Sequence, residues 1–151
     1  MSYYETDFED AARQIISHLK SAQGVPDRSV VLIPGGSVEH TTYNDVKDVK
    51  DWKECYEEPL RDLLQMGVPV VLAAGNYAKQ NHRHNVDTRP QVYESVMPLI
   101  SVGAANDKGE RLEMSQISPG QTMLYAPGEN IEGLAKTDFA KASHSGTSVG
   151  A

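Results

Sequence analysis

The sequence has 151 residues, enough for one domain with a hydrophobic core, and a hydrophobic content of 39% favours a globular chain over a disordered one. Acidic residues outnumber basic ones, 21 to 14, and the formal charge of -7 argues against DNA or RNA as a partner because a polyanion would be repelled. No apolar run is long enough to span a bilayer and the first residues lack the basic and apolar parts of a signal peptide, so no membrane partner is expected and the compartment stays open.

The first predicted element is an amphipathic helix. The stretch Thr6 to Glu9 has the form of a capping box, which puts the start of the helix at Thr6. Apolar residues then recur at three- and four-residue spacing, as on one face of a helix: Phe8, Ala11, Ala12, Ile15, Ile16 and Leu19. Gly24 and Pro26 end this helix. The β-branched run from Ser29 to Ile33 that follows is typical of a strand covered on both faces.

The same order of helix and strand occurs a second time. One helical face is predicted between Trp52 and Leu64, where Pro59 either kinks the helix or marks the beginning of its second part. The lone Cys55 allows no internal disulfide and is interpreted as a small apolar residue of this helix. Gly67 is the predicted stop, and Val68 to Ala74 is the next buried strand.

Two further strands are predicted from Pro98 to Ala104 and from Met123 to Ala126. Helices and buried strands that alternate along a chain indicate an α/β domain with right-handed crossovers. The sequence therefore predicts a mainly parallel sheet with flanking helices, in one domain over residues 1–151.

Polar stretches follow the first two predicted strands, from Ser37 to Lys50 and from Tyr77 to Gln91, and both are expected to be surface loops. In an open parallel sheet, the loops that leave the carboxyl ends of the strands surround the ligand crevice. Gly35-Gly36 and Gly75-Asn76 stand at the beginning of these loops. We therefore expect both turns to lie where a substrate can be held.

Two turns carry the residue types of an acyl-transfer site. In one, a tight loop presents Ser148; in the other, Asn76 follows a buried strand that ends in small residues. Attack on a carbonyl needs such a pair, a nucleophile and a donor for the negative charge that develops on the oxygen. Each motif by itself has a simpler interpretation, a helix cap for the serine and a left-handed turn for the asparagine.

Three further segments accompany these motifs: the apolar run 97–104, the pair Ser115-Gln116, and 124–128 before the serine loop. In this order and spacing the chain resembles the subtilisin-like serine proteases, from about Glu9 to its last residue. The resemblance implies a three-layer α/β fold, serine-type endopeptidase activity on a peptide or protein substrate, and no cofactor or metal. It also implies that Ser148 is the nucleophile and Asn76 the oxyanion donor. The specificity pocket would lie between Ile33, Pro34, Gly35 and Gly36 on one side and Ala73, Ala74 and Gly75 on the other.

The chain also departs from this family. The family's aspartate motif and its His-Gly-Thr-His motif are absent, and Val149 to Ala151 is a looser version of the Met-Ala-x-Pro that usually follows the nucleophile. The chain is therefore interpreted as the C-terminal part of a catalytic domain, expected to hydrolyse peptides little or not at all by itself. The alternative is a non-catalytic peptide-binding relative that has kept the groove and lost the triad. A fortuitous likeness of an unrelated α/β module is a third interpretation.

Local histidines offer weak substitutes for the missing base. His144 lies four residues before the candidate nucleophile, but an extended backbone between them gives no reason for the imidazole to face the hydroxyl. His82 and His84 have a spacing that suits two zinc ligands, yet no third ligand is recognisable. Solvent-exposed loop histidines are the favoured interpretation, and no metal site is predicted.

Overall fold

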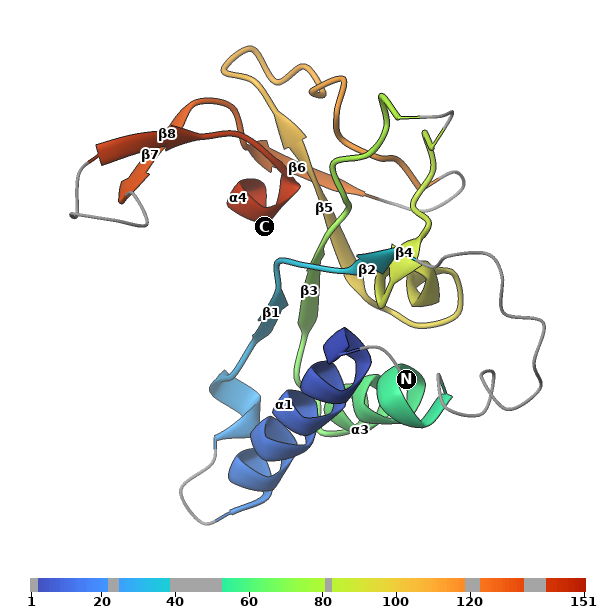
Figure 1. Ribbon diagram of the computed structural model, residues 1–151. Helices are drawn as coiled ribbons and strands as arrows, with labels where there is room; N and C mark the ends of the chain where they lie inside the picture. The colour runs from blue at the N-terminus through green and yellow to red at the C-terminus, as the bar shows by residue number, and fades with distance from the viewer. Residues whose placement is uncertain (1–2, 22–24, 39–52, 81–82, 119–122, 135–140) are drawn as a thin grey trace.

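The computed structural model describes residues 3–21, 25–38, 53–80, 83–118, 123–134 and 141–151. Its centre is a four-stranded parallel sheet with the strand order β1-β3-β5-β6 (Figure 1). The strands are β1 (Val31–Ile33), β3 (Val70–Ala73), β5 (Ile100–Ala105) and β6 (Leu124–Pro127). All four lie within the segments where the sequence predicts strands or no more than one residue beyond them. The predicted α/β class with a mainly parallel sheet is confirmed.

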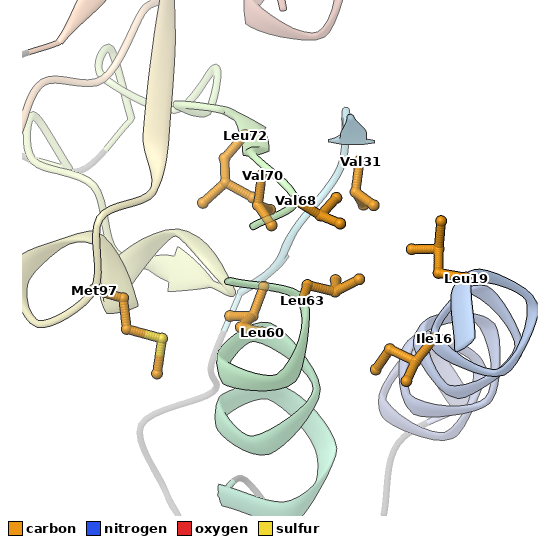
Figure 2. Packing of buried hydrophobic residues seen from close by; sticks show 9 residues of the cluster. All are labelled: Ile16, Leu19, Val31, Leu60, Leu63, Val68, Val70, Leu72 and Met97. Atoms are coloured by element: carbon orange, nitrogen blue, oxygen red, sulfur yellow. The ribbon is translucent and has the colours of Figure 1, made fainter. Parts of the chain in front are cut away.

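Two helices pack side by side near β1 and β3 (Figure 1). They are α1 (Tyr3–Lys20) and α3 (Glu58–Gln65), the latter preceded by a π-helical turn, η2 (Lys53–Glu57). Figure 2 shows apolar side chains of both helices pointing toward the strands. Together with apolar side chains of the strands they form one core cluster. The buried members of this cluster are Ile16, Leu19, Val31, Leu60, Leu63, Val68, Val70, Leu72 and Met97. Burial of these side chains against one another is the main stabilising contribution to this part of the domain.

The remaining elements are short. Two are 3-10 helices, η1 (Pro26–Arg28) and η3 (Gln91–Ser95). Four strands form two antiparallel pairs, β2 (Ser37–Val38) with β4 (Thr88–Arg89) and β7 (Ile131–Leu134) with β8 (Lys141–His144). The chain ends in the single turn α4 (Thr147–Gly150), which packs against β3, β5 and β6. None of the helices in the described ranges is both long and apolar enough to cross a membrane.

The predicted capping box at the start of α1 is wrong. The helix begins at Tyr3, so Thr6 has a helical backbone and cannot serve as the N-cap. Glu9, which was expected to reach back to the N-cap, instead accepts a hydrogen bond from Arg13 one turn later at 2.7 Å and another from Cys55 at 3.4 Å. The predicted apolar stripe holds for Ala12, Ile16 and Leu19, which are buried, whereas Ala11 and Ile15 face solvent.

The prediction of two surface loops is wrong in part. Val38 pairs with Thr88, so the beginning of one polar stretch and the end of the other form the β2–β4 ribbon. Thr88 and Gln91 are buried. The rest of the first stretch, 39–50, lies outside the described residues. Pro59 stands in the first turn of α3, where its missing N–H has no helical partner to lose, so the interpretation that it marks the second part of the helix is confirmed.

Truncation of a core leucine tests this packing. Leu60 of α3 is fully buried in the core cluster, and Leu60→Ala should lower the free energy of unfolding by about 2–5 kcal/mol because it leaves a cavity. The matched control is Leu134→Ala on β7, where the side chain is 66% exposed and the expected change is within about 0.5 kcal/mol. Urea unfolding measures both, and equal losses in the two variants would contradict the described core.

Candidate functional site

The loop after β3 and the first turn of α4 meet through the side chains of Asn76 and Thr147. The Oδ1 atom of Asn76 accepts a hydrogen bond from the backbone N–H of Thr147 at 2.8 Å and a second from its hydroxyl at 3.1 Å. The hydroxyl of Thr147 in turn accepts from the backbone N–H of Gly75 at 3.0 Å. Thr147 is buried, so the three groups satisfy one another away from solvent. The two turns that the sequence singles out are therefore in direct contact.

This arrangement decides how the Asn76 carboxamide is oriented. A backbone N–H can only donate, so the atom that faces Thr147 must be the carboxamide oxygen. The Nδ2 group is then the other end of the carboxamide, and a Cβ at Gly146 would lie 2.9 Å from it. Gly146 has a φ of 154°, a conformation that side chains rarely adopt, so a glycine is required there on two grounds. The Asn76 carboxamide is therefore held in one orientation.

A cleft of about 160 Å³ lies over these groups, at the carboxyl ends of β1 and β3. Ser148, the second residue of α4, is exposed at its edge, whereas Asn76 is half-buried. Seven of the residues that the sequence predicts for the site line this cleft: Pro34, Gly35, Gly36, Ala73, Gly75, Asn76 and Ser148. The sequence thus brings together a hydroxyl, an amide donor and small-residue walls in one place.

Two predicted site residues lie elsewhere. Ala74 is fully buried, and its backbone N–H donates to Val102 of β5. Ile33 lines a neighbouring apolar cavity of about 310 Å³ together with Phe8, Tyr56 and others. That cavity shares Gly35 and Gly36 with the cleft, so the two hollows meet at the same glycine turn.

Four residues that sequence reasoning did not select also line the cleft: Tyr77, Thr88, Gln91 and Thr147. Thr88 and Gln91 belong to β4 and η3, in the stretch that the sequence predicts to be a surface loop. No local pattern distinguishes them from the other polar residues of that stretch. Thr147 directly precedes Ser148, and this position next to the predicted nucleophile is the one sequence feature that points to Thr147.

The wall behind Gly75 is held by the buried side chain of Gln116. The backbone N–H of Gln116 donates to the carbonyl of Gly75 at 2.9 Å. Its Nε2 group donates to the carbonyls of Arg83 and Asn85 and to Oδ1 of Asp87 at 2.7–3.0 Å. Burial raises the pKa of the Asp87 carboxyl, but hydrogen bonds from Arg83 and Gln116 outweigh it and leave that pKa below its ordinary value. These hydrogen bonds hold the segment 83–87 that leads into β4, and they thereby help to position Thr88.

Among the described residues that line the cleft there is no histidine, aspartate or glutamate. His144 is exposed on β8, opposite Ile131, and is not a lining residue. His84 is exposed, while His82 lies outside the described residues. Within the described part of the chain no three His, Cys, Asp or Glu side chains gather in a group that could hold a metal ion.

No protein-family model and no curated protein matches the sequence. Solved structures do. The self-cleaved protease domain of PatA is 26% identical, with a TM-score of 0.65 over 93% of this chain and 46% of that one. A cold adapted subtilisin-like serine proteinase is 23% identical, with a TM-score of 0.57 over 92% of this chain and 43% of that one. The chain has a subtilisin-like fold.

A PatG macrocyclase in complex with peptide is also similar, at 22% identity and a TM-score of 0.58 over 93% of this chain and 37% of that one. The subtilisin-like fold therefore accounts for almost the whole chain, as its motifs suggest. The chain spans less than half the length of each of these structures.

The Asp87 network gives a pH-dependent contribution to stability. Because the pKa of Asp87 is depressed in the folded state, its contribution is present above about pH 4, the unfolded value, and is lost as the pH falls through the folded value. Asp87→Asn should therefore destabilise the protein at pH 7, and this destabilisation should become smaller as the pH falls below about 4. Urea unfolding at several pH values measures this. Asp107→Asn at an exposed position is the control, and an Asp87→Asn effect that does not change with pH would refute the prediction.

The hydroxyl of Thr147 can be removed without changing the shape of the side chain. Thr147→Val leaves the N–H of Gly75 without its acceptor and should lower the free energy of unfolding by about 1–3 kcal/mol. Thr147→Ser keeps the hydroxyl and should retain most of the stability. Chemical denaturation compares the two, and a valine variant as stable as the serine variant would show that this contact contributes nothing.

Proposed function

We propose that this chain carries the nucleophile, the oxyanion donor and the specificity pocket of a subtilisin-like serine endopeptidase. One observation carries the proposal: Thr147 holds the Asn76 carboxamide so that its Nδ2 group is the available donor, in the same cleft as the exposed Ser148. An acyl-transfer site needs a hydroxyl that can reach the carbonyl carbon of the substrate and a fixed hydrogen-bond donor that can reach the oxygen of the same carbonyl. The subtilisin-like fold of the solved relatives supports the assignment.

In the proposed reaction the hydroxyl oxygen of Ser148 attacks the carbonyl carbon of the peptide bond, and its proton passes to a general base. The carbonyl oxygen becomes an oxyanion and accepts a hydrogen bond from Nδ2 of Asn76, which is already oriented and needs no reorganisation. The amine leaves with the proton from the base, and water then releases the acid from the acyl-enzyme. No cofactor takes part.

The substrate's side chain nearest the scissile bond would lie between the two small-residue walls, Ile33 to Gly36 and Ala73 to Gly75. The contribution of Ile33 and Ala74 would be structural, since neither lines the cleft. Glycines at 35 and 36 allow a peptide backbone to approach closely. The peptide bound to the PatG macrocyclase, a structural relative, supports a peptide as the substrate class.

The general base would come from outside the residues described here. The described lining of the cleft has no imidazole or carboxylate, and His144 stands apart on β8. A serine without a base is a weak nucleophile at neutral pH. The chain by itself should therefore bind peptides and hydrolyse them little or not at all.

The same observation favours a second function, peptide binding without hydrolysis by a relative that has lost the triad. Both functions use the cleft and the Asn76 donor. They differ in whether Ser148 forms a covalent bond, and that difference can be measured.

A peptide boronic acid tests the proposal. The hydroxyl of Ser148 releases its proton to water or buffer and its oxygen adds to boron, which changes from trigonal to a tetrahedral anion that resembles the intermediate. We expect a tetrahedral boron signal in ¹¹B NMR at neutral pH, where the free boronic acid stays trigonal because it has not added hydroxide, and we expect Ser148→Ala to abolish this signal. The control is Ser143→Ala at an exposed position on β8.

Asn76→Asp tests the donor. The remaining carboxylate oxygen still accepts from Thr147, but the Nδ2 donor is replaced by a charged oxygen, so affinity for the boronic acid should fall by about 100-fold or more. A tetrahedral adduct that persists in Ser148→Ala would refute the nucleophile. Tight binding that stays trigonal in every variant would support the non-catalytic alternative instead.

A further inference from the structure

The floor of the cleft is formed by a buried amide. Gln91, the first residue of η3, is 1% exposed, and Thr88 of β4 beside it is 2% exposed. The hydroxyl of Thr88 donates to Oε1 of Gln91 at 3.0 Å, and Nε2 of Gln91 donates to the carbonyl of Gly35 at 3.0 Å. The amide is therefore held at both ends, by Thr88 of β4 and by the glycine turn. A side chain held by two hydrogen bonds resists displacement, because breaking either bond would leave a buried polar atom without a partner.

This amide also lies against the backbone of the glycine turn. A Cβ built at Gly36 would be 2.3 Å from Oε1 and 2.9 Å from Cδ and Nε2 of Gln91. By contrast, a Cβ at Gly35 would meet nothing within 4 Å. Gln91 thus fills the space directly beneath one wall, and it limits how far a substrate side chain can enter between the walls.

The lining of the cleft is uncharged. None of its residues is an aspartate, glutamate, lysine, arginine or histidine, and the nearby carboxylate of Asp87 is already paired with Arg83 and Gln116. A charged side chain that entered the cleft would lose water without gaining an opposite charge, which is unfavourable. The polar groups of the floor are engaged with one another. The cleft therefore suits a side chain that is short and uncharged.

We propose that Gln91 is a specificity-determining residue that shortens the pocket, so that the site selects a short, uncharged side chain next to the scissile bond and rejects aromatic and basic ones. This inference rests on the proposed function, since it assigns the pocket to the residue whose carbonyl Ser148 would attack. It places the determinant in the β4–η3 segment and not in the small-residue walls.

Three peptide boronic acids that differ only in the residue bearing boron, analogues of alanine, phenylalanine and lysine, provide the test. The protein should bind the alanine analogue at least about 10-fold more tightly than the other two, a typical effect of misfit in a pocket. Gln91→Ala removes the floor and should bring the phenylalanine analogue to within about 3-fold of the alanine analogue. Gln65→Ala, at an exposed end of α3, is the matched control and should leave the preference unchanged.

A double-mutant cycle checks the premise without any ligand. Gly36→Ala should destabilise the protein through the contact with the Gln91 amide, and the same change in a Gln91→Ala background should cost less. If Gln91→Ala does not fold, Gln91→Asn, which is shorter by one methylene group and keeps the amide, takes its place in the binding test.

The outcomes separate this inference from the function it rests on. Equal affinities for the three analogues, or an unchanged preference in the folded Gln91 variant, would overturn the role of Gln91 and leave the proposed function intact. Failure of all three analogues to bind would overturn the proposed function, and the pocket assignment with it. A preference for alanine that Gln91→Ala relaxes toward phenylalanine would support both.

Discussion

Two segments 71 positions apart in the sequence meet through the carboxamide of Asn76, which accepts both donors of Thr147. The geometry of the cleft depends on this interaction. It fixes the position of α4 relative to β3, and it decides which end of the carboxamide is free to donate. Gly146 must be a glycine for the same reason, since a side chain there would meet the nitrogen. A single set of hydrogen bonds therefore joins the fold to the candidate chemistry.

The parallel sheet makes this meeting possible. The turns after β1 and β3 leave the same edge of the sheet because neighbouring parallel strands point the same way. The turn after β6 links the end of β5 to the residue before α4: the backbone N–H of Gly128 donates to the carbonyl of Ala105 at 2.9 Å, and the N–H of Gly146 donates to the carbonyl of Gly128 at 2.8 Å. The apolar core of α1, α3 and the strands lies behind this edge and holds β1 and β3 in register (Figure 2). Side chains at the edge are thus positioned by burial elsewhere.

The cleft combines two kinds of group in the proposed enzyme, those that stabilise charge and those that recognise the substrate. Asn76 belongs to the first kind, while Gln91 and Thr88 belong to the second. The base that would activate Ser148 is not among the described lining residues. A chain of this length corresponds to less than half of the solved relatives, so binding and transition-state stabilisation would reside here and proton transfer elsewhere.

The sequence by itself determined the two longer helices, the four strands of the parallel sheet and their order along the chain, the parallel α/β class, and the two turns that hold Asn76 and Ser148. These features follow from two local patterns, the apolar periodicity of α1 and α3 and the β-branched runs of β1 and β3. Both patterns arise because apolar residues occupy the positions that are buried. The local rule failed at Thr6, because whether a helix continues past a candidate cap depends on its surroundings. Only the tertiary structure decided that Thr88 and Gln91 form the floor of the cleft. Their hydrogen bonds join a strand to a glycine turn more than fifty residues away, and a bond between a side chain and a distant backbone atom leaves no periodic trace in the sequence.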